Sequence, residues 1–219
     1  MFVDFPGPAG RLEGILSTPD ATRFAAIVCH PHPLFGGTMH NHATFRLARA
    51  LGACGGATLR FHFRGVGRSE GTHDHGQGEV DDAAAALAHL VARAPGVPVW
   101  VAGFSFGARV ALALAVREPQ LVRAALVIGV AVRTFDHGFA RALPIPIAAV
   151  QAEGDEFGAP AEVEAVLGAR PGPFHLGIVP GTGHLFTDDL DRLEAEVEGA
   201  AAWLTARPGV ALPPAGSVG

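Results

Sequence analysis

The segment Val99-Trp-Val-Ala-Gly-Phe-Ser-Phe-Gly107 decides how the rest of the chain is interpreted. Its first four residues form a short apolar run typical of a buried strand, and the residues from Ala108 to Glu118 favour a helix. The G-x-S-x-G sequence between them is, in that position, the signature of a nucleophile elbow. The turn is so sharp that the two glycine positions of the motif, Gly103 and Gly107, tolerate only residues without a bulky side chain. With 29 glycines in the chain this pattern is weak alone, so it requires a base, an acid and an oxyanion site elsewhere.

The composition indicates a compact globular protein. Hydrophobic residues make up 49% of the 219 residues and charged residues 17%. The net charge of −5, without a basic cluster, argues against nucleic acid as a partner. We expect no membrane partner, because no apolar run approaches the roughly 18 residues that span a bilayer, and the first residues do not form a signal peptide. Two cysteines, Cys29 and Cys54, are too few for a disulfide framework, which favours a cytoplasmic location.

Eight apolar segments predict strands, and polar or alanine-rich stretches between them predict helices. The predicted strands are residues 2–5, 12–17, 25–29, 57–61, 99–102, 124–132, 147–151 and 174–179. The predicted helices are residues 42–54, 80–94, 108–118, 161–167 and 190–207, with a short, partly helical connection at 134–143.

This alternation predicts an α/β fold. Strands linked by helices form a mostly parallel sheet that helices cover on both faces, a three-layer αβα sandwich with about seven or eight strands. We expect one domain over residues 1–207. Residues 208–219, rich in proline, glycine and small residues, are expected to form a flexible tail.

The strand ends supply the chemistry that the elbow requires. In a parallel sheet, ligands bind outside the carboxyl ends of the strands. A serine hydroxyl there needs a base and an orienting carboxylate before it can attack an ester. After Ser105, the next carboxylates at a strand end lie in Gln151-Ala-Glu-Gly-Asp-Glu156, and the next histidine in such a position is His184. The order serine, acid, histidine is the chain order of α/β-hydrolases.

The chain up to about Arg207 therefore resembles a small α/β-hydrolase. The segments His30-Pro-His-Pro-Leu-Phe-Gly-Gly-Thr-Met39, with Asn41, and Phe63-Arg-Gly-Val-Gly-Arg-Ser-Glu-Gly71 narrow the resemblance. They are similar to a family of compact, cap-less bacterial hydrolases close to the dienelactone-hydrolase-like esterases. That family usually has asparagine where His62 stands. Larger relatives insert a helical cap where this chain has only residues 133–146, so the resemblance implies a shallow, open site.

The resemblance also implies roles for individual residues. Ser105 corresponds to the nucleophile, His184 to the general base and then acid, and Asp155 to the carboxylate that orients His184. One oxyanion N–H is expected from Phe106, the residue after the nucleophile. The other should come from the loop after the strand 25–29, where two prolines have no N–H, which leaves His32 or Leu34. Aligning Gly36-Gly37 with the glycines that follow the His-Gly of related hydrolases favours Leu34.

Other residues near the strand ends have weaker interpretations. Five histidines in or near the first loops suggest a metal, but their spacing does not support one, and we expect neither metal nor cofactor. We interpret Arg64 and Arg68 with Glu79 as a charge cluster that holds a loop; binding of a substrate carboxylate is the alternative. We interpret Glu153 and Glu156 as solvated loop carboxylates. The apolar residues expected to line the substrate pocket are Phe35, Phe135, Phe157 and Leu185.

The sequence thus predicts a serine hydrolase that cleaves small carboxyl esters through a Ser-His-Asp triad and an acyl-enzyme intermediate. A thioesterase, or a small-peptide or amide hydrolase, would use the same triad, because pocket walls choose the leaving group. A non-catalytic binding protein with the α/β-hydrolase fold is a further alternative. The expected partner is a small-molecule ester, and the sequence allows either a monomer or a homodimer.

Overall fold

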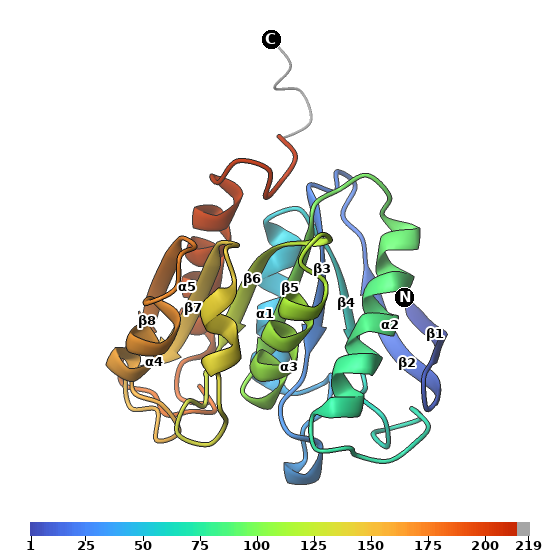
Figure 1. Cartoon of the computed structure of the whole chain (residues 1–219), viewed down its shortest axis with the longest axis horizontal. Helices are drawn as coiled ribbons and strands as arrows, with labels where there is room; N and C mark the ends of the chain where they lie inside the picture. Colours follow the sequence, from blue (N-terminus) through green and yellow to red (C-terminus); the bar gives the residue numbers. More distant parts are fainter. Residues whose placement is uncertain (214–219) are drawn as a thin grey trace.

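The computed structural model describes residues 1–213 and contains one eight-stranded sheet with the order β1-β2-β4-β3-β5-β6-β7-β8 (Figure 1). Every predicted strand is present. The strands are β1 (Phe2–Gly7), β2 (Gly10–Ser17), β3 (Phe24–Cys29), β4 (Gly56–Phe61), β5 (Val99–Phe104), β6 (Val122–Ile128), β7 (Ile147–Ala152) and β8 (Phe174–Val179).

The sheet is mostly parallel, as predicted. β1 and β2 form an antiparallel hairpin, and β2 pairs antiparallel with β4. All other neighbouring strands pair in parallel, from β4 to β8. Every residue of β3, β5 and β7 is buried, which explains why the sequences of these strands are continuous apolar runs.

Helices cover both faces of the sheet and complete the three layers (Figure 1). The helices are α1 (His42–Ala53), α2 (Gln77–Arg93), α3 (Phe106–Arg117), α4 (Pro160–Leu167) and α5 (Leu190–Thr205). Alternate strand residues point to opposite faces. Ile27 and Val101 therefore belong to the core on the side of α2, α3 and α4, whereas Val28 and Ala102 belong to the core on the side of α1 and α5.

The connection from β6 to β7 holds only the short 3-10 helix η2 (Gly138–Ala142), without an inserted cap. The loops that follow the parallel strands lie together at the lower edge of the sheet in Figure 1. The functional residues predicted from the sequence belong to these loops and therefore to this edge.

One predicted strand is too long. The apolar run 124–132 predicts a strand through Val132, but β6 ends at Ile128. Gly129 adopts a left-handed φ of 54° there, and its N–H donates to the carbonyl of Val150. A side chain at Gly129 would lie 2.6 Å from the ring of Phe104 and 3.3 Å from His184 Cε1. The strand ends where it does because the backbone must make room for these two rings.

Part of the predicted tail, residues 208–212, has contacts with the rest of the fold. Val210 is buried on the α1 and α5 face, and its carbonyl accepts a hydrogen bond of 2.6 Å from Trp100 Nε1. Leu212 N–H donates to the carbonyl of Arg23, and Arg23 Nε donates back to the carbonyl of Leu212. This segment therefore packs against the sheet, and residues 214–219 of the predicted tail lie outside the described residues.

Candidate active site

The G-x-S-x-G segment forms a tight turn between β5 and α3. Ser105 has φ 56° and ψ −117°, a strained combination for a residue with a side chain. A Cβ on Gly103 would lie 2.2 Å from the carbonyl oxygen of Gly107. A Cβ on Gly107 would lie 2.3 Å from the carbonyl oxygen of Cys29 and 2.5 Å from that of His30. Both glycines are required because backbone passes where a side chain would be.

The three residues predicted as a triad lie in contact with one another. His184 Nε2 is 2.9 Å from Ser105 Oγ, and His184 Nδ1 is 2.9 Å from Asp155 Oδ2. All three side chains are buried. A carboxylate accepts a proton only from Nδ1–H, so the proton of the neutral ring is on Nδ1 and Nε2 is free to accept the hydroxyl proton of Ser105.

The loop after β3 carries the candidate oxyanion donors. Leu34 N–H donates to His32 Nδ1 at 3.2 Å, so it is already engaged. Within residues 1–213, neither His32 N–H nor Phe106 N–H donates to a protein acceptor. The His32 ring lies 4.7 Å from the ring of Phe106, which brings this loop against the elbow.

The comparisons with known proteins show the family to which the chain belongs. The family described as "Serine aminopeptidase, S33" matches residues 23–151, more than half of the chain, including β3, β5 and the elbow. The chain belongs to the serine α/β-hydrolase family.

Individual relatives of this serine α/β-hydrolase agree with the assignment. The crystal structure of ATU1826 from Agrobacterium tumefaciens, a protein of unknown function, is 34% identical with a TM-score of 0.87 and covers 98% of this chain and 100% of its own. XC6422 from Xanthomonas campestris, described as an α/β serine hydrolase without lid, is 33% identical with a TM-score of 0.85 and covers 95% and 96%. The uncharacterized protein RP471 of Rickettsia prowazekii is 40% identical over 158 residues, 69% of this chain and 65% of RP471. The match thus spans just under two thirds of RP471.

A buried glutamine holds the carboxylate of this α/β-hydrolase in place. Gln151, at the end of β7, donates from Nε2 to Asp155 Oδ2 at 2.8 Å and to the carbonyl of Gly158 at 2.7 Å. Its Oε1 accepts the N–H of Val130 at 2.8 Å. Asp155 Oδ1 also accepts the N–H of Phe157 at 2.9 Å. The sequence motifs assign Gln151 no role, although a polar residue in the otherwise apolar strand Ile147–Ala152 is a signal for one.

We expect Gln151→Glu to lower kcat at least about tenfold, because a supporting side chain that fixes a reactive group has effects of this size. The substitution replaces the amide donor with a second carboxyl group at about the same distance from Asp155. Two carboxylates in contact do not both ionise easily, so the pKa of the pair in the variant rises. The acidic limb of the pH profile of kcat/KM therefore moves to higher pH. Steady-state kinetics across pH on a neutral ester measure both effects.

Gln120→Glu is the matched control, because Gln120 is exposed and the charge change is the same. It is expected to leave kcat and the pH profile unchanged. A wild-type profile in Gln151→Glu would show that Gln151 does not act through Asp155.

The two glutamates near Asp155 stabilise the histidine loop. Glu153 Oε2 accepts the N–H of Gly181 at 2.9 Å, and Glu156 Oε2 accepts the N–H of His184 at 3.3 Å. Both glutamates are exposed, in agreement with their interpretation as loop carboxylates.

The glycine-rich loop after β4 is held by ion pairs, but the partners differ from those expected. Arg64 binds Asp82 of α2 with Nη2–Oδ1 at 2.8 Å, and this carboxylate raises the pKa of Arg64 through its hydrogen bonds. Arg68 binds Glu13, with Nε–Oε2 at 2.7 Å. Burial alone would raise the pKa of Glu13, but the hydrogen bonds from Arg68 and His62 lower it to about 2. Both arginines are thus committed to structural pairs, so neither offers a free fork to a substrate carboxylate.

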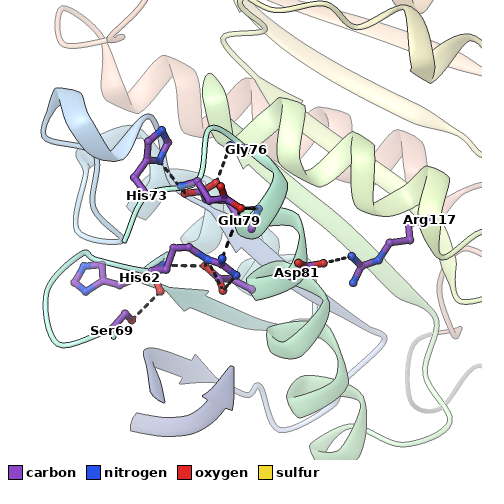
Figure 2. Close-up of polar contacts among 11 residues, drawn as sticks. His62, Ser69, His73, Gly76, Glu79, Asp81 and Arg117 are labelled. Carbon is purple, nitrogen blue, oxygen red and sulfur yellow. Dashed lines mark hydrogen bonds and ion pairs between the residues drawn. The ribbon is translucent and has the colours of Figure 1, made fainter. Parts of the chain in front are cut away.

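Glu79 is the third anchor of this loop. Figure 2 shows its buried carboxylate next to His73 and Gly76. Oε2 accepts the N–H of Gly76 at 2.7 Å, Oε1 accepts the N–H of Asp74 at 2.9 Å, and His73 Nδ1 is 2.8 Å from Oε1. Glu79 therefore fixes the backbone at Asp74 and Gly76, and with it the start of α2.

The predicted pocket residues surround the triad unevenly. The rings of Phe157 and His184 pack edge to face, with their centroids 4.7 Å apart. The ring centroids of Phe135 and Phe106 are 5.8 Å apart. Phe35 and Leu185 are 87% and 57% exposed, so they stand at the rim of the site.

The histidines near the first loops have contacts that do not involve an ion. His30 is fully buried, its Nε2 accepts the N–H of Phe63, and burial lowers its pKa to about 3. His62 Nδ1 is 2.9 Å from Glu13 Oε1. Within residues 1–213, no three His, Cys, Asp or Glu side chains are grouped so that they could hold a metal ion. In the same part of the chain, no helix is long and apolar enough to cross a membrane.

Proposed function

We propose that this protein is a serine esterase that cleaves small carboxyl esters through an acyl-enzyme intermediate. The observation that carries the proposal is the contact chain Ser105–His184–Asp155, with 2.9 Å at each step. Ser105 Oγ attacks the ester carbonyl while His184 Nε2 takes its proton, and Asp155 stabilises the imidazolium that forms. His184 then protonates the departing alcohol, and a water molecule, activated by the same ring, releases the acid.

The tetrahedral intermediate needs two N–H donors for its oxyanion. We propose Phe106 as one of them. For the other, the hydrogen bond from Leu34 N–H to His32 Nδ1 favours His32 N–H over Leu34. The side chain of His32 then has a second role, because it holds the loop in the conformation that presents its own backbone N–H.

Three features support small esters over the alternatives. The β6–β7 connection contains no cap, so the site is open, and the aromatic rings of Phe106, Phe135 and Phe157 surround it. Arg109 lines a cavity together with His32 and Phe106, and its positive charge disfavours the ammonium group that an aminopeptidase must bind.

The two free cysteines, Cys29 and Cys54, support our proposal of a cytoplasmic location.

A substrate panel tests the proposed function. We expect kcat/KM to be highest for 4-nitrophenyl esters with short acyl chains, and lower for the matching thioesters and for amino-acid 4-nitroanilides. The reason is that an open, aromatic surround buries a short acyl group but encloses no long chain. The highest kcat/KM on nitroanilides, or on long-chain esters, would contradict the proposal.

A further inference from the structure

A cavity of about 260 Å³ lies beside the nucleophile elbow. Its wall includes His32, His73, His75, Phe106, Arg109 and Phe135. Two of these belong to the proposed oxyanion hole, so an ester whose carbonyl oxygen lies there has this cavity next to its reacting carbon. A water molecule occupies about 30 Å³ in the liquid, so the volume of the cavity corresponds to on the order of eight water molecules. A short substituent of the substrate fits in this space.

Arg109 is a half-buried cation without a carboxylate partner. Within residues 1–213, its guanidinium makes no ion pair and donates no hydrogen bond to the protein. It lies 5.7 Å from the ring centroid of Phe139, and its Nη1 would be 2.8 Å from a Cβ on Gly76. Arg64 and Arg68, in contrast, are both paired with carboxylates. A planar fork of free donors beside a reaction centre is suited to a carboxylate.

The imidazoles of the cavity add donors to the same wall. His32 Nδ1 accepts the N–H of Leu34, so the neutral ring carries its proton on Nε2. Burial, together with the nearby His73 and His75, lowers the pKa of His32 below its ordinary value, against an opposing effect of Glu79. His73 Nδ1 lies 2.8 Å from Glu79 Oε1, without the alignment of a hydrogen bond.

The acidic groups around the cavity leave Arg109 available. Asp136 lies on the wall, but it is exposed and its Oδ1 accepts the N–H of Gly138 at 2.7 Å. Glu79, behind His73, already accepts two backbone N–H groups (Figure 2). Neither carboxylate forms an ion pair with Arg109, so the donors of Arg109 stay available, while Asp136 keeps its own negative charge at the exposed side of the same wall.

We propose that this cavity is a subsite for a carboxylate carried on a short arm of the substrate, and that Arg109 is the residue that selects it. The proposal rests on the proposed esterase function and specifies its substrate class: esters in which one half bears a carboxylate a few bonds from the reacting carbonyl. Arg109 forms the ion pair with that carboxylate, and the histidine ring of His32 donates from Nε2 on the same wall.

Two pairs of substrates test the proposal, each differing by a carboxylate in place of a methyl group. Monobenzyl glutarate and benzyl pentanoate differ in the acyl half, and 3-carboxyphenyl butyrate and 3-methylphenyl butyrate differ in the alcohol half. In one pair we expect the wild-type protein to prefer the carboxylated ester at least about tenfold in kcat/KM, the size of a charged hydrogen bond. The pair that shows the preference identifies which half occupies the cavity. An absence of preference in both pairs would overturn the proposal.

Arg109→Gln is expected to remove this preference. It should lower kcat/KM on the carboxylated ester at least about tenfold and on the neutral ester less than about twofold. Arg117→Gln is the matched control, because it removes the same charge from the far end of α3, where Arg117 pairs with Asp81 (Figure 2). It should keep the wild-type preference. An equal loss on both esters in Arg109→Gln would assign Arg109 a structural role and overturn the proposal.

Calorimetric titration with glutarate tests the subsite without turnover. The wild-type protein and Arg117→Gln should bind glutarate at least about tenfold more tightly than Arg109→Gln. Binding that the Arg109 substitution leaves unchanged would overturn the subsite. Glutarate binding that depends on Arg109, with no turnover of any of the four esters, would support the subsite and contradict the esterase function.

Discussion

Replacement of Ser105 by alanine is expected to lower kcat on 4-nitrophenyl butyrate by about 10⁴- to 10⁶-fold, because residues of a serine triad act as a unit and loss of the nucleophile removes the acyl-enzyme route. The hydroxyl that is lost lies 2.9 Å from His184 Nε2, the proposed base. The same substitution should abolish covalent labelling by a fluorophosphonate probe. Spectrophotometric turnover and gel fluorescence measure the two effects.

Ser17→Ala is the control for Ser105→Ala, since Ser17 is an exposed serine at the end of β2. It should leave turnover and labelling intact. Retained labelling of Ser105→Ala would place the nucleophile elsewhere. A wild-type protein that neither turns over esters nor labels would favour a non-catalytic binding protein with this fold.

Gly107→Ala is expected to destabilise the fold and the site together. The new Cβ would lie 2.3 Å from the carbonyl oxygen of Cys29, a backbone atom of a buried strand that cannot move aside. We expect the free energy of unfolding to fall by about 2–4 kcal/mol, the upper range for overpacking in a core. The shift of α3 also displaces the Phe106 N–H, and misplacement by about 1 Å costs on the order of 10²-fold in kcat. Urea denaturation and steady-state kinetics measure these quantities.

Gly199→Ala is the matched control for the glycine substitution. Gly199 is exposed in the middle of α5, and no neighbouring atom lies within 4 Å of the place that a methyl group would take there. Alanine at this position should stabilise the protein by about 0.5–1 kcal/mol, since it restricts the unfolded chain and favours the helix. Equal stability of Gly107→Ala and the wild-type protein would show that the elbow does not pack tightly against the end of β3.

Much of the fold follows from local sequence, because strands buried on both faces are continuous apolar runs and helices show their own period. All eight strands were therefore predictable, from the Phe2–Gly7 hairpin strand to β8. The error at β6 has a non-local cause. Gly129 ends that strand to make room for Phe104 and His184, and the apolar sequence beyond it gives no local sign of this contact.

The same difference separates the candidate site residues that were predictable from those that were not. Ser105, Asp155 and His184 follow strands, and the carboxyl ends of parallel strands meet at one edge of the sheet. Gln151 and Arg109 belong to no motif, and their importance depends on what lies next to them. Arg64 was expected to pair with Glu79 but binds Asp82, because only the packing of α2 decides which carboxylate faces it.

The sequence by itself determined which strands and helices follow one another along the chain, the elbow, and the three residues of the proposed triad. Periodicity and the order of residues along the chain are local properties, which do not depend on how distant segments pack. The tertiary structure decided which N–H groups and side chains remain free. Leu34 N–H is engaged by His32 because of the conformation of the loop after β3. Val210 contacts Trp100, and Arg109 faces a cavity without a carboxylate partner among residues 1–213. These last two outcomes depend on segments that only folding brings together.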